Sequence, residues 1–240
     1  MYFIYMSQRI TCAFIIIFLG LCLSSCMTQI DGSLAANGSA SMSVSMSLQP
    51  RMSALIRVLS AAGGRGNAAL DGPAIARSMS AAPGVQSAVF RNTSAAAIEG
   101  QVRIYQINEF LSVTNEIGFI TFEQRTAGGR CVINIERSKS PEILVLLSSE
   151  ISDYLNALMA PIATGEELSK SEYLDLVSSF YNRAISDEIS SSRVRASIEF
   201  PGTVTNVTGG TFSGRRANFD IPLLDLLVLE TPMIFEVNWN

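Results

Sequence analysis

The segment from Asn37 to Leu48 reads NGSASMSVSMSL, with an apolar residue at every second position and serine in the gaps. Side chains of a β-strand point alternately to its two faces, whereas this spacing would scatter apolar residues around a helix. The pair Asn37-Gly38 is a strong hairpin signal, because both residues tolerate positive φ. We therefore expect the second arm of a hairpin, with a core face and a solvent face: Ala40, Met42, Val44, Met46 and Leu48 against Ser39, Ser41, Ser43, Ser45 and Ser47.

Prolines and glycines delimit the elements that follow the hairpin. A proline in the first turn and Gly63-Gly64 after the end predict a helix from Pro50 to Ala62. A second, shorter helix is expected from Pro73 to Ala82. The pattern then predicts two strands, a short helix and a hairpin of two further strands, at residues 85–92, 98–106, 108–113, 119–125 and 130–137.

Two longer helices are expected in the C-terminal half. Ser140-Pro141-Glu142 predicts the start of a helix that runs to Met159, although residues 143–147 are apolar on all sides and also fit a buried strand. Ser169 and Glu172 have the spacing of a capping box, which predicts a helix to Ile189. Residues 161–167 would join the two into a helical hairpin. Four strands complete the prediction, at residues 193–200, 204–207, 215–221 and 233–239.

These elements predict an α+β fold, in which a mostly antiparallel and strongly curved sheet packs against a helical hairpin and one or two short helices. The sequence has no tandem repeat, no long linker and no charged low-complexity block. Residues 26–240 are therefore interpreted as a single domain that follows Cys26 after a short linker.

The N-terminus has the tripartite pattern of a secretory signal. Arg9 is the only charge in residues 1–25, and an apolar run follows from Ile10 to Leu23 that is shorter than the ~20 residues of a spanning helix. The run ends in Leu23-Ser24-Ser25-Cys26, which resembles the bacterial lipobox: an aliphatic residue, two small residues and the cysteine that receives lipid. We expect cleavage after residue 25 and lipid attachment, including palmitate, at Cys26. An ordinary signal peptide with an incidental cysteine is the alternative.

The charge and cysteine content limit the partners and the stabilising bonds of the mature chain. Losing Arg9 with residues 1–25 changes the formal net charge from −4 to −5, which argues against nucleic-acid binding. Only Cys26 and Cys131 remain after cleavage, and Cys26 would carry lipid. We therefore expect no intramolecular disulfide, and a domain held by its own hydrophobic core.

The composition argues against an enzyme. The chain has no histidine, which removes the commonest general base and metal ligand. The only lysines are Lys139 and Lys170, and Lys170 falls in an exposed first turn. We interpret the C-terminal acids Asp220, Asp225 and Glu230 as surface residues rather than a catalytic pair. The sequence thus predicts no catalytic residues, no metal site and no cofactor.

Two further residue types have a structural and a functional interpretation. Cys131 is expected to be a buried strand residue, since one neighbouring arginine is weak evidence for a reactive thiol. Arginines 193, 195, 215 and 216 could bind a phosphate or carboxylate ligand. The alternative that we favour is pairing along exposed strands with Glu199, Asp220 and Glu236.

The segment EFPGTVTNVTGGTFSG, from Glu199 to Gly214, resembles the signature of the LppM-like bacterial lipoprotein domain. The preceding hairpin, ITFEQRTAGGRCVINIER, is of the same kind, and the resemblance covers about residues 87–217. Members of the family often continue with a Trp-containing strand and a membrane helix, whereas this chain has Asn218-Phe219-Asp220 at that point. The resemblance implies an α+β domain that binds lipid or other envelope components, and it carries over no catalytic residue.

Two functions are consistent with these features. The first is a non-enzymatic lipoprotein of the bacterial cell envelope, at an outer membrane or periplasmic face, that binds a lipid or another amphipathic ligand. Four methionines offer an adaptable apolar lining for it: Met42, Met46, Met52 and Met159. The second is a structural or assembly factor that holds another envelope protein at exposed sheet edges. The ligand-binding residues are unknown from the sequence.

Overall fold

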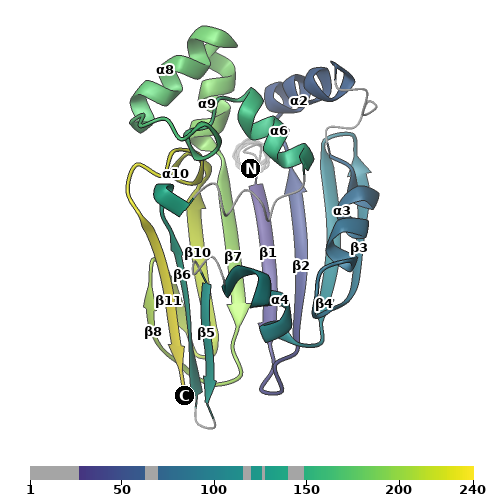
Figure 1. Cartoon of the computed structure of the whole chain (residues 1–240), viewed down its shortest axis with the longest axis vertical. Helices are drawn as coiled ribbons and strands as arrows, with labels where there is room; N and C mark the ends of the chain where they lie inside the picture. The colour runs from purple at the N-terminus through teal and green to yellow at the C-terminus, as the bar shows by residue number, and fades with distance from the viewer. Residues whose placement is uncertain (1–26, 63–69, 116–119, 126–127, 140–148) are drawn as a thin grey trace, which may run out of the picture.

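A computed structural model describes residues 27–62, 70–115, 120–125, 128–139 and 149–240 of the chain. These residues form an α+β fold with two sheets, one of seven strands and one of four, and a group of helices at one end (Figure 1). The strands are β1 (Met27–Leu34), β2 (Ala40–Ser47), β3 (Val85–Ser94), β4 (Ala97–Ile104), β5 (Ile120–Arg125), β6 (Gly128–Ile135), β7 (Arg193–Glu199), β8 (Val204–Thr208), β9 (Thr211–Ser213), β10 (Arg216–Pro222) and β11 (Met233–Trp239).

The N-terminal hairpin is confirmed, together with its register. β1 pairs antiparallel with β2 from Met27 opposite Ser47 to Leu34 opposite Ala40. Every serine of β2 is exposed and every apolar residue of β2 is half-buried, as the alternation predicts. β1 lies in the interior of the seven-stranded sheet, because its other edge pairs with β7.

The sheet arrangement differs from the prediction of one strongly curved sheet. The seven strands run in the order β3-β4-β2-β1-β7-β10-β9, and the four strands in the order β5-β6-β11-β8, with neither sheet strongly curled. All pairs are antiparallel except β1 with β7. Apolar side chains are enclosed by placing one sheet against a face of the other (Figure 1), so a single sheet does not have to close on itself.

The Phe-Pro-Gly segment is the point where the chain leaves one sheet for the other. β7 belongs to the seven-stranded sheet, Phe200 to Gly202 follow it, and β8 belongs to the four-stranded sheet. A side chain on Gly202 would collide with the backbone of Asn240, so this position requires glycine. After β8, the turn Gly209-Gly210 returns the chain to the first sheet at β9.

The helical end contains more, and shorter, helices than predicted. α2 (Pro50–Ala62) begins and ends as expected, and the described part of the expected helix at 140–159 is α6 (Ser149–Ala157). Residues 140–148, with the strand alternative for 143–147, lie outside the described residues. The other helices of this group are α7 (Pro161–Thr164), α8 (Lys170–Phe180), α9 (Arg183–Ser191) and α10 (Leu223–Val228).

The predicted helix from Ser169 to Ile189 is in fact two helices. The capping box at its start is present, with Ser169 and Glu172 bonded reciprocally. The helix then breaks, and Asn182 begins α9 by accepting a hydrogen bond from the amide of Ile185 at 3.1 Å. An asparagine side chain competes for backbone amides and so favours a new helix start over continuation.

We call these six helices, α2 and α6 to α10, the helical cap. Their apolar faces meet in one core in which Tyr173, Val177, Ile189 and Val228 have no exposed surface. The carboxylate of Glu188 in α9 accepts hydrogen bonds from the backbone amides of Arg51 and Met52 and thereby fixes the start of α2. The cap therefore has a densely packed core of its own.

Two helices lie outside the cap. α3 (Gly72–Ser80) packs along β3, and its first turn is capped by Asp71, which accepts from the amide of Ala74 at 2.9 Å. α4 (Ile107–Asn115) follows β4 and contacts β5, and in Figure 1 it lies in front of the seven-stranded sheet, between β5 and β4.

Candidate ligand cavity

A cavity of about 370 Å³ lies between the two sheets and is partly open. Its size is within the range of small-molecule sites. The lining comes from eight strands, from α4 and from Phe200 after β7: Ile30, Gly32, Ser33, Leu34, Ala40, Met42, Ile104, Ile107, Phe110, Leu111, Ile120, Phe122, Cys131, Ile133, Ile135, Ala196, Ile198, Phe200, Phe219, Ile221, Phe235 and Val237.

The lining is apolar because every contributing strand turns alternate residues inward. In β6 these are Cys131, Ile133 and Ile135, and the opposite sheet contributes Ile30 and other residues at the same period. Ser33 is the one lining residue with a hydroxyl, and its Oγ lies 2.9 Å from that of the exposed Ser41. The wall thus offers contact to hydrocarbon and no side-chain partner for a charged or strongly polar group.

Aromatic rings close one end of the cavity and the helical cap lies at the other. The indole of Trp239 stacks on Phe122 with 5.9 Å between ring centroids and meets Phe200 at 4.9 Å. In the wall itself, Phe219 meets Phe235 edge-on at 5.6 Å. Packing of the two sheets is thus tight at the aromatic end, and the space remains between that cluster and the cap.

Gly32 keeps part of the cavity clear. A methyl group at this position would lie 2.7 Å from Cδ1 of Ile198 and 3.6 Å from Cγ of Met42, both of which line the cavity. Because these are the ends of flexible side chains, a larger residue would displace them into the open space. The absence of a side chain at Gly32 therefore contributes directly to the volume.

Cys131 is a free cysteine in the wall of the cavity. Burial raises the pKa of its thiol to about 11. The thiol therefore stays protonated at neutral pH and acts as a small apolar group, as the sequence predicts.

The methionines predicted to form an adaptable lining separate in the structure. Met42 lines the cavity, whereas Met52 is buried in the core of the helical cap. Met46 and Met159 are half-buried and lie outside the lining. Sequence reasoning missed the isoleucines and phenylalanines that make most of the wall, although those on strands, such as Ile133 and Ile135 in β6, follow the period-two pattern.

The candidate polar groups are engaged elsewhere. Lys170 Nζ contacts Asp225 at 2.8 Å, and its amide donates to Glu230 at 3.2 Å. Asp220 lies 3.7 Å from both Arg193 and Arg195. Among the described residues, no group of three or more acids and cysteines is placed to hold a metal ion.

The other arginines follow the interpretation as exposed strand pairs. Arg215 and Arg216 contact Glu199 at 3.6 and 3.3 Å, and Glu236 pairs instead with Arg130 at 2.8 Å. Partly exposed pairs of this kind contribute little to stability and leave few free donors for a phosphate.

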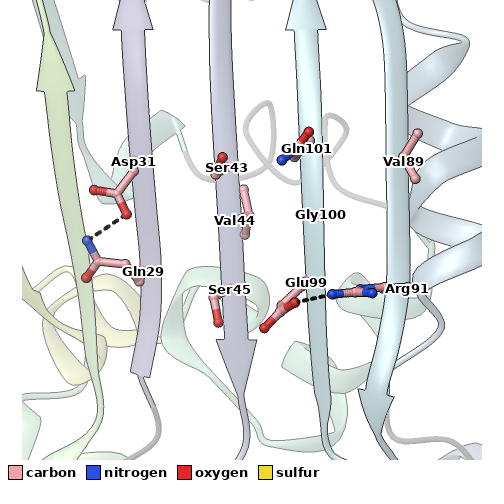
Figure 2. A pocket seen from close by; sticks show the side chains of 10 residues that line it. All are labelled: Gln29, Asp31, Ser43, Val44, Ser45, Val89, Arg91, Glu99, Gly100 and Gln101. Atoms are coloured by element: carbon pink, nitrogen blue, oxygen red, sulfur yellow. Dashed lines mark hydrogen bonds and ion pairs between the residues drawn. The ribbon is translucent and has the colours of Figure 1, made fainter.

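The outer face of the seven-stranded sheet is a contrasting surface. A shallow trough there is lined by Gln29, Asp31, Ser43, Ser45, Arg91, Glu99 and Gln101, with Val44, Val89 and Gly100 between them (Figure 2). Gln29 donates to Asp31 at 3.2 Å and Arg91 to Glu99 at 3.0 Å. These polar groups are partnered with one another in an open, hydrated surface, so the enclosed apolar space is the better candidate site.

Cys26, the predicted site of lipid attachment, lies outside the described residues. In the structure β1 begins at Met27, so no linker of the predicted kind separates Cys26 from the first strand. None of the helices in the described ranges has the length and apolar character needed to cross a bilayer.

Comparison with known proteins gives one solved structure. No protein-family model matches the chain, and no curated protein matches it. The chain is similar to the NMR structure of the folded domain of LppM from Mycobacterium tuberculosis, with 9% sequence identity and a TM-score of 0.43 over 90% of this chain and 89% of that chain. The LppM-like family is also the one named from the sequence, and this structural likeness does not test the Phe-Pro-Gly segment on which that resemblance was based.

Proposed function

We propose that this chain is a lipid-anchored protein of the bacterial cell envelope that holds an acyl chain of a lipid, or a similar amphipathic ligand, between its two sheets. The observation that carries the proposal is the cavity of about 370 Å³ with an apolar wall. The anchor rests on the lipobox at residues 23–26.

The energetic cost of an empty cavity supports a resident ligand. Apolar surface that is left uncovered forfeits ~25 cal/mol per Å² of the stabilisation that burial would give. Water would gain little there, since the wall has no side-chain hydrogen-bond partner to offer it. An apolar ligand removes most of the cost.

The chemistry of the wall defines the ligand class. Half-buried isoleucine and phenylalanine side chains bind hydrocarbon through area and shape, and none of them selects a polar group. The partial opening leaves room for a head group to remain in water. A lipid with its acyl chain inside and its head group outside satisfies both conditions.

A binding role without catalysis is supported by the chemical groups in the site. The chain has no histidine, and the pKa of the Cys131 thiol is raised to about 11 by burial. Of the candidate acids, Asp220 and Asp225 are paired with cations and Glu230 accepts the backbone amide of Lys170, and none of the three lines the cavity. We infer a carrier or sensor of lipid rather than an enzyme.

Native mass spectrometry of the mature protein tests the ligand. We expect a non-covalent mass of one lipid in addition to the covalent anchor. Ala196 lines the cavity, so Ala196→Phe should reduce bound lipid by filling the space. The matched control Ser43→Phe places the same ring on the exposed outer face and should leave bound lipid unchanged.

Absence of lipid from the unmodified protein, together with a co-purifying envelope protein, would favour the assembly factor instead. Equal loss of lipid in Ala196→Phe and Ser43→Phe would contradict the assigned site.

Fractionation of cells expressing Cys26→Ser tests the anchor separately. Two or more acyl chains attach a protein stably, at ~0.8 kcal/mol per buried methylene. We expect the variant to leave the membrane fraction or to retain its signal. Normal processing with full retention in membranes would contradict lipid attachment at Cys26.

A further inference from the structure

The position of β1 relative to the helices determines which surface would meet the membrane. β1 starts at Met27, in register with Ser47 of β2 and Arg193 of β7, and its hairpin turn is at the opposite end of the sheet (Figure 1). Consecutive Cα atoms are ~3.8 Å apart, so a lipid on Cys26 would lie within one residue of the paired sheet. The body of the protein therefore has almost no freedom to move away from the bilayer.

The elements beside Met27 all lead into the helical cap. α2 begins at Pro50, shortly after Ser47, and α9 ends at Ser191, shortly before Arg193. Gln49 donates to Oγ of Ser191 at 3.0 Å and ties the two helices together at this point. The cap is therefore at the anchored end of the molecule, and the aromatic cluster around Trp239 is at the far end.

Within the cap, α2 combines positive charge with exposed apolar surface, whereas α6, α8 and α9 carry exposed acids such as Asp153, Asp175 and Asp187 and would face away from anionic lipid. α2, PRMSALIRVLSAA, carries two arginines and no acid, and Arg51 and Arg57 are both exposed. Val58 of α2 and Phe180 at the end of α8 are 66% and 67% exposed, which places them among the most exposed large apolar side chains of the described residues. Arginines beside exposed apolar groups fit the boundary between anionic head groups and acyl chains.

We propose that the helical cap lies on the membrane, with α2 in contact with anionic phospholipid head groups and Val58 and Phe180 inserted among the upper acyl chains. This orientation rests on the proposed anchor at Cys26. It directs the long axis of both sheets away from the bilayer and places the Trp239 cluster at the distal end.

Quenching by brominated lipids tests the orientation. The lipidated mature protein is reconstituted in phosphatidylcholine–phosphatidylglycerol vesicles with brominated acyl chains, as the variants Val58→Trp, Phe180→Trp and Phe212→Trp. Phe212, in β9, is 47% exposed and lies away from the cap. Because interfacial groups penetrate ~5–10 Å, the first two indoles should lose most of their added fluorescence, and the third should keep it.

A charge reversal sharpens the test. Arg51→Glu/Arg57→Glu in the Val58→Trp background should restore fluorescence, whereas Arg77→Glu/Arg103→Glu, at exposed sites outside the cap, should not. Protein that floats with vesicles but shows equal quenching at all three positions overturns the orientation while leaving the anchor intact. Protein that does not float has no anchor, which overturns both.

Discussion

The helical cap and the space between the sheets are both built from apolar side chains, yet they differ in how completely those side chains are covered. In the cap, Tyr173, Val177 and Ile189 have no exposed surface. In the wall of the cavity, Ile133, Phe219 and Phe235 are only half-buried, although they face the interior. The first region has the density of an ordinary core and the second does not.

The difference separates a region that supplies stability from the region that is proposed to hold the ligand. A packed core tolerates little change in volume, so the cap supplies rigidity. An apolar cavity adds to the stability of the fold when a ligand fills it and adds little when it is empty. The contribution of this region to stability therefore depends on a bound ligand. Substitutions in the cap should therefore affect mainly unfolding, and substitutions in the wall should affect mainly ligand retention.

The largest effect is expected from a matched pair of isoleucines. Ile189→Ala in the cap should lower the free energy of unfolding by about 4 kcal/mol, or about 10 °C in Tm, because it opens a void in a packed core. Ile133→Ala in the wall should cost about 1.5 kcal/mol, since it enlarges an existing space beside a half-buried residue. Thermal denaturation of both variants measures the two costs. Equal costs would contradict the difference in packing between the cap and the cavity wall.

The two faces of β2 provide the next test. Val44→Asp places a carboxylate on the half-buried face and should cost about 3 kcal/mol. Ser41→Asp, on the exposed face between Ser33 and Arg103, should be nearly neutral. Ser43 is a poorer control, because it lies opposite Asp31. Denaturant unfolding gives the free energy of unfolding of each variant. If Ser41→Asp lowered it more than Val44→Asp, the assigned register of β2 would be wrong.

Alkaline pH should reveal the burial of the cavity wall. The pKa of Cys131 is raised from 9.0 to about 11, so the folded state keeps its proton while the unfolded state loses it. This contribution is fully present below pH 9 and is lost as the pH rises to 11, by about 3 kcal/mol. The difference in unfolding free energy between the unmodified protein and Cys131→Ala should shift by that amount. A difference independent of pH would contradict a buried thiol.

The smallest expected change in stability concerns two methionines of β2. Met42 lines the cavity and Met46 does not, although both are half-buried. Each change to alanine should cost about 1 kcal/mol, because each removes a half-buried side chain. Met42→Ala should also weaken lipid retention in native mass spectra, and Met46→Ala should not. Equal retention in both variants would indicate that Met42 only packs.

Local patterns in the sequence were sufficient for the elements and for the hairpin of β1 and β2. The alternation in 40–48, the caps at Asp71 and Ser169 and the bounds of α2 are local signals, and the structure follows them. The break at Asn182 is also a local signal, because an asparagine is a favourable first residue for a helix, but the prediction of one helix to Ile189 did not use it. The short strand β9 and the helix α10 have too few residues to show a period.

The division into two sheets and the cavity could not be predicted in the same way. Both depend on pairings between distant segments, such as β1 with β7 and β6 with β11. Alternation shows that Ile133 and Ile198 are turned inward, but not that they face one another across an open space. Composition alone favoured methionines for the lining, whereas strand position selects isoleucine and phenylalanine.

The central place of β1 constrains the order in which the protein is made and folded. Met27 is synthesised early, and its partner Arg193 follows only after 165 further residues. The seven-stranded sheet is thus incomplete until most of the polypeptide has emerged, and its formation requires closure of a very long loop, which slows folding. The complete seven-stranded sheet can therefore form only late in synthesis or after it, which is the order that the proposed export of the chain would require.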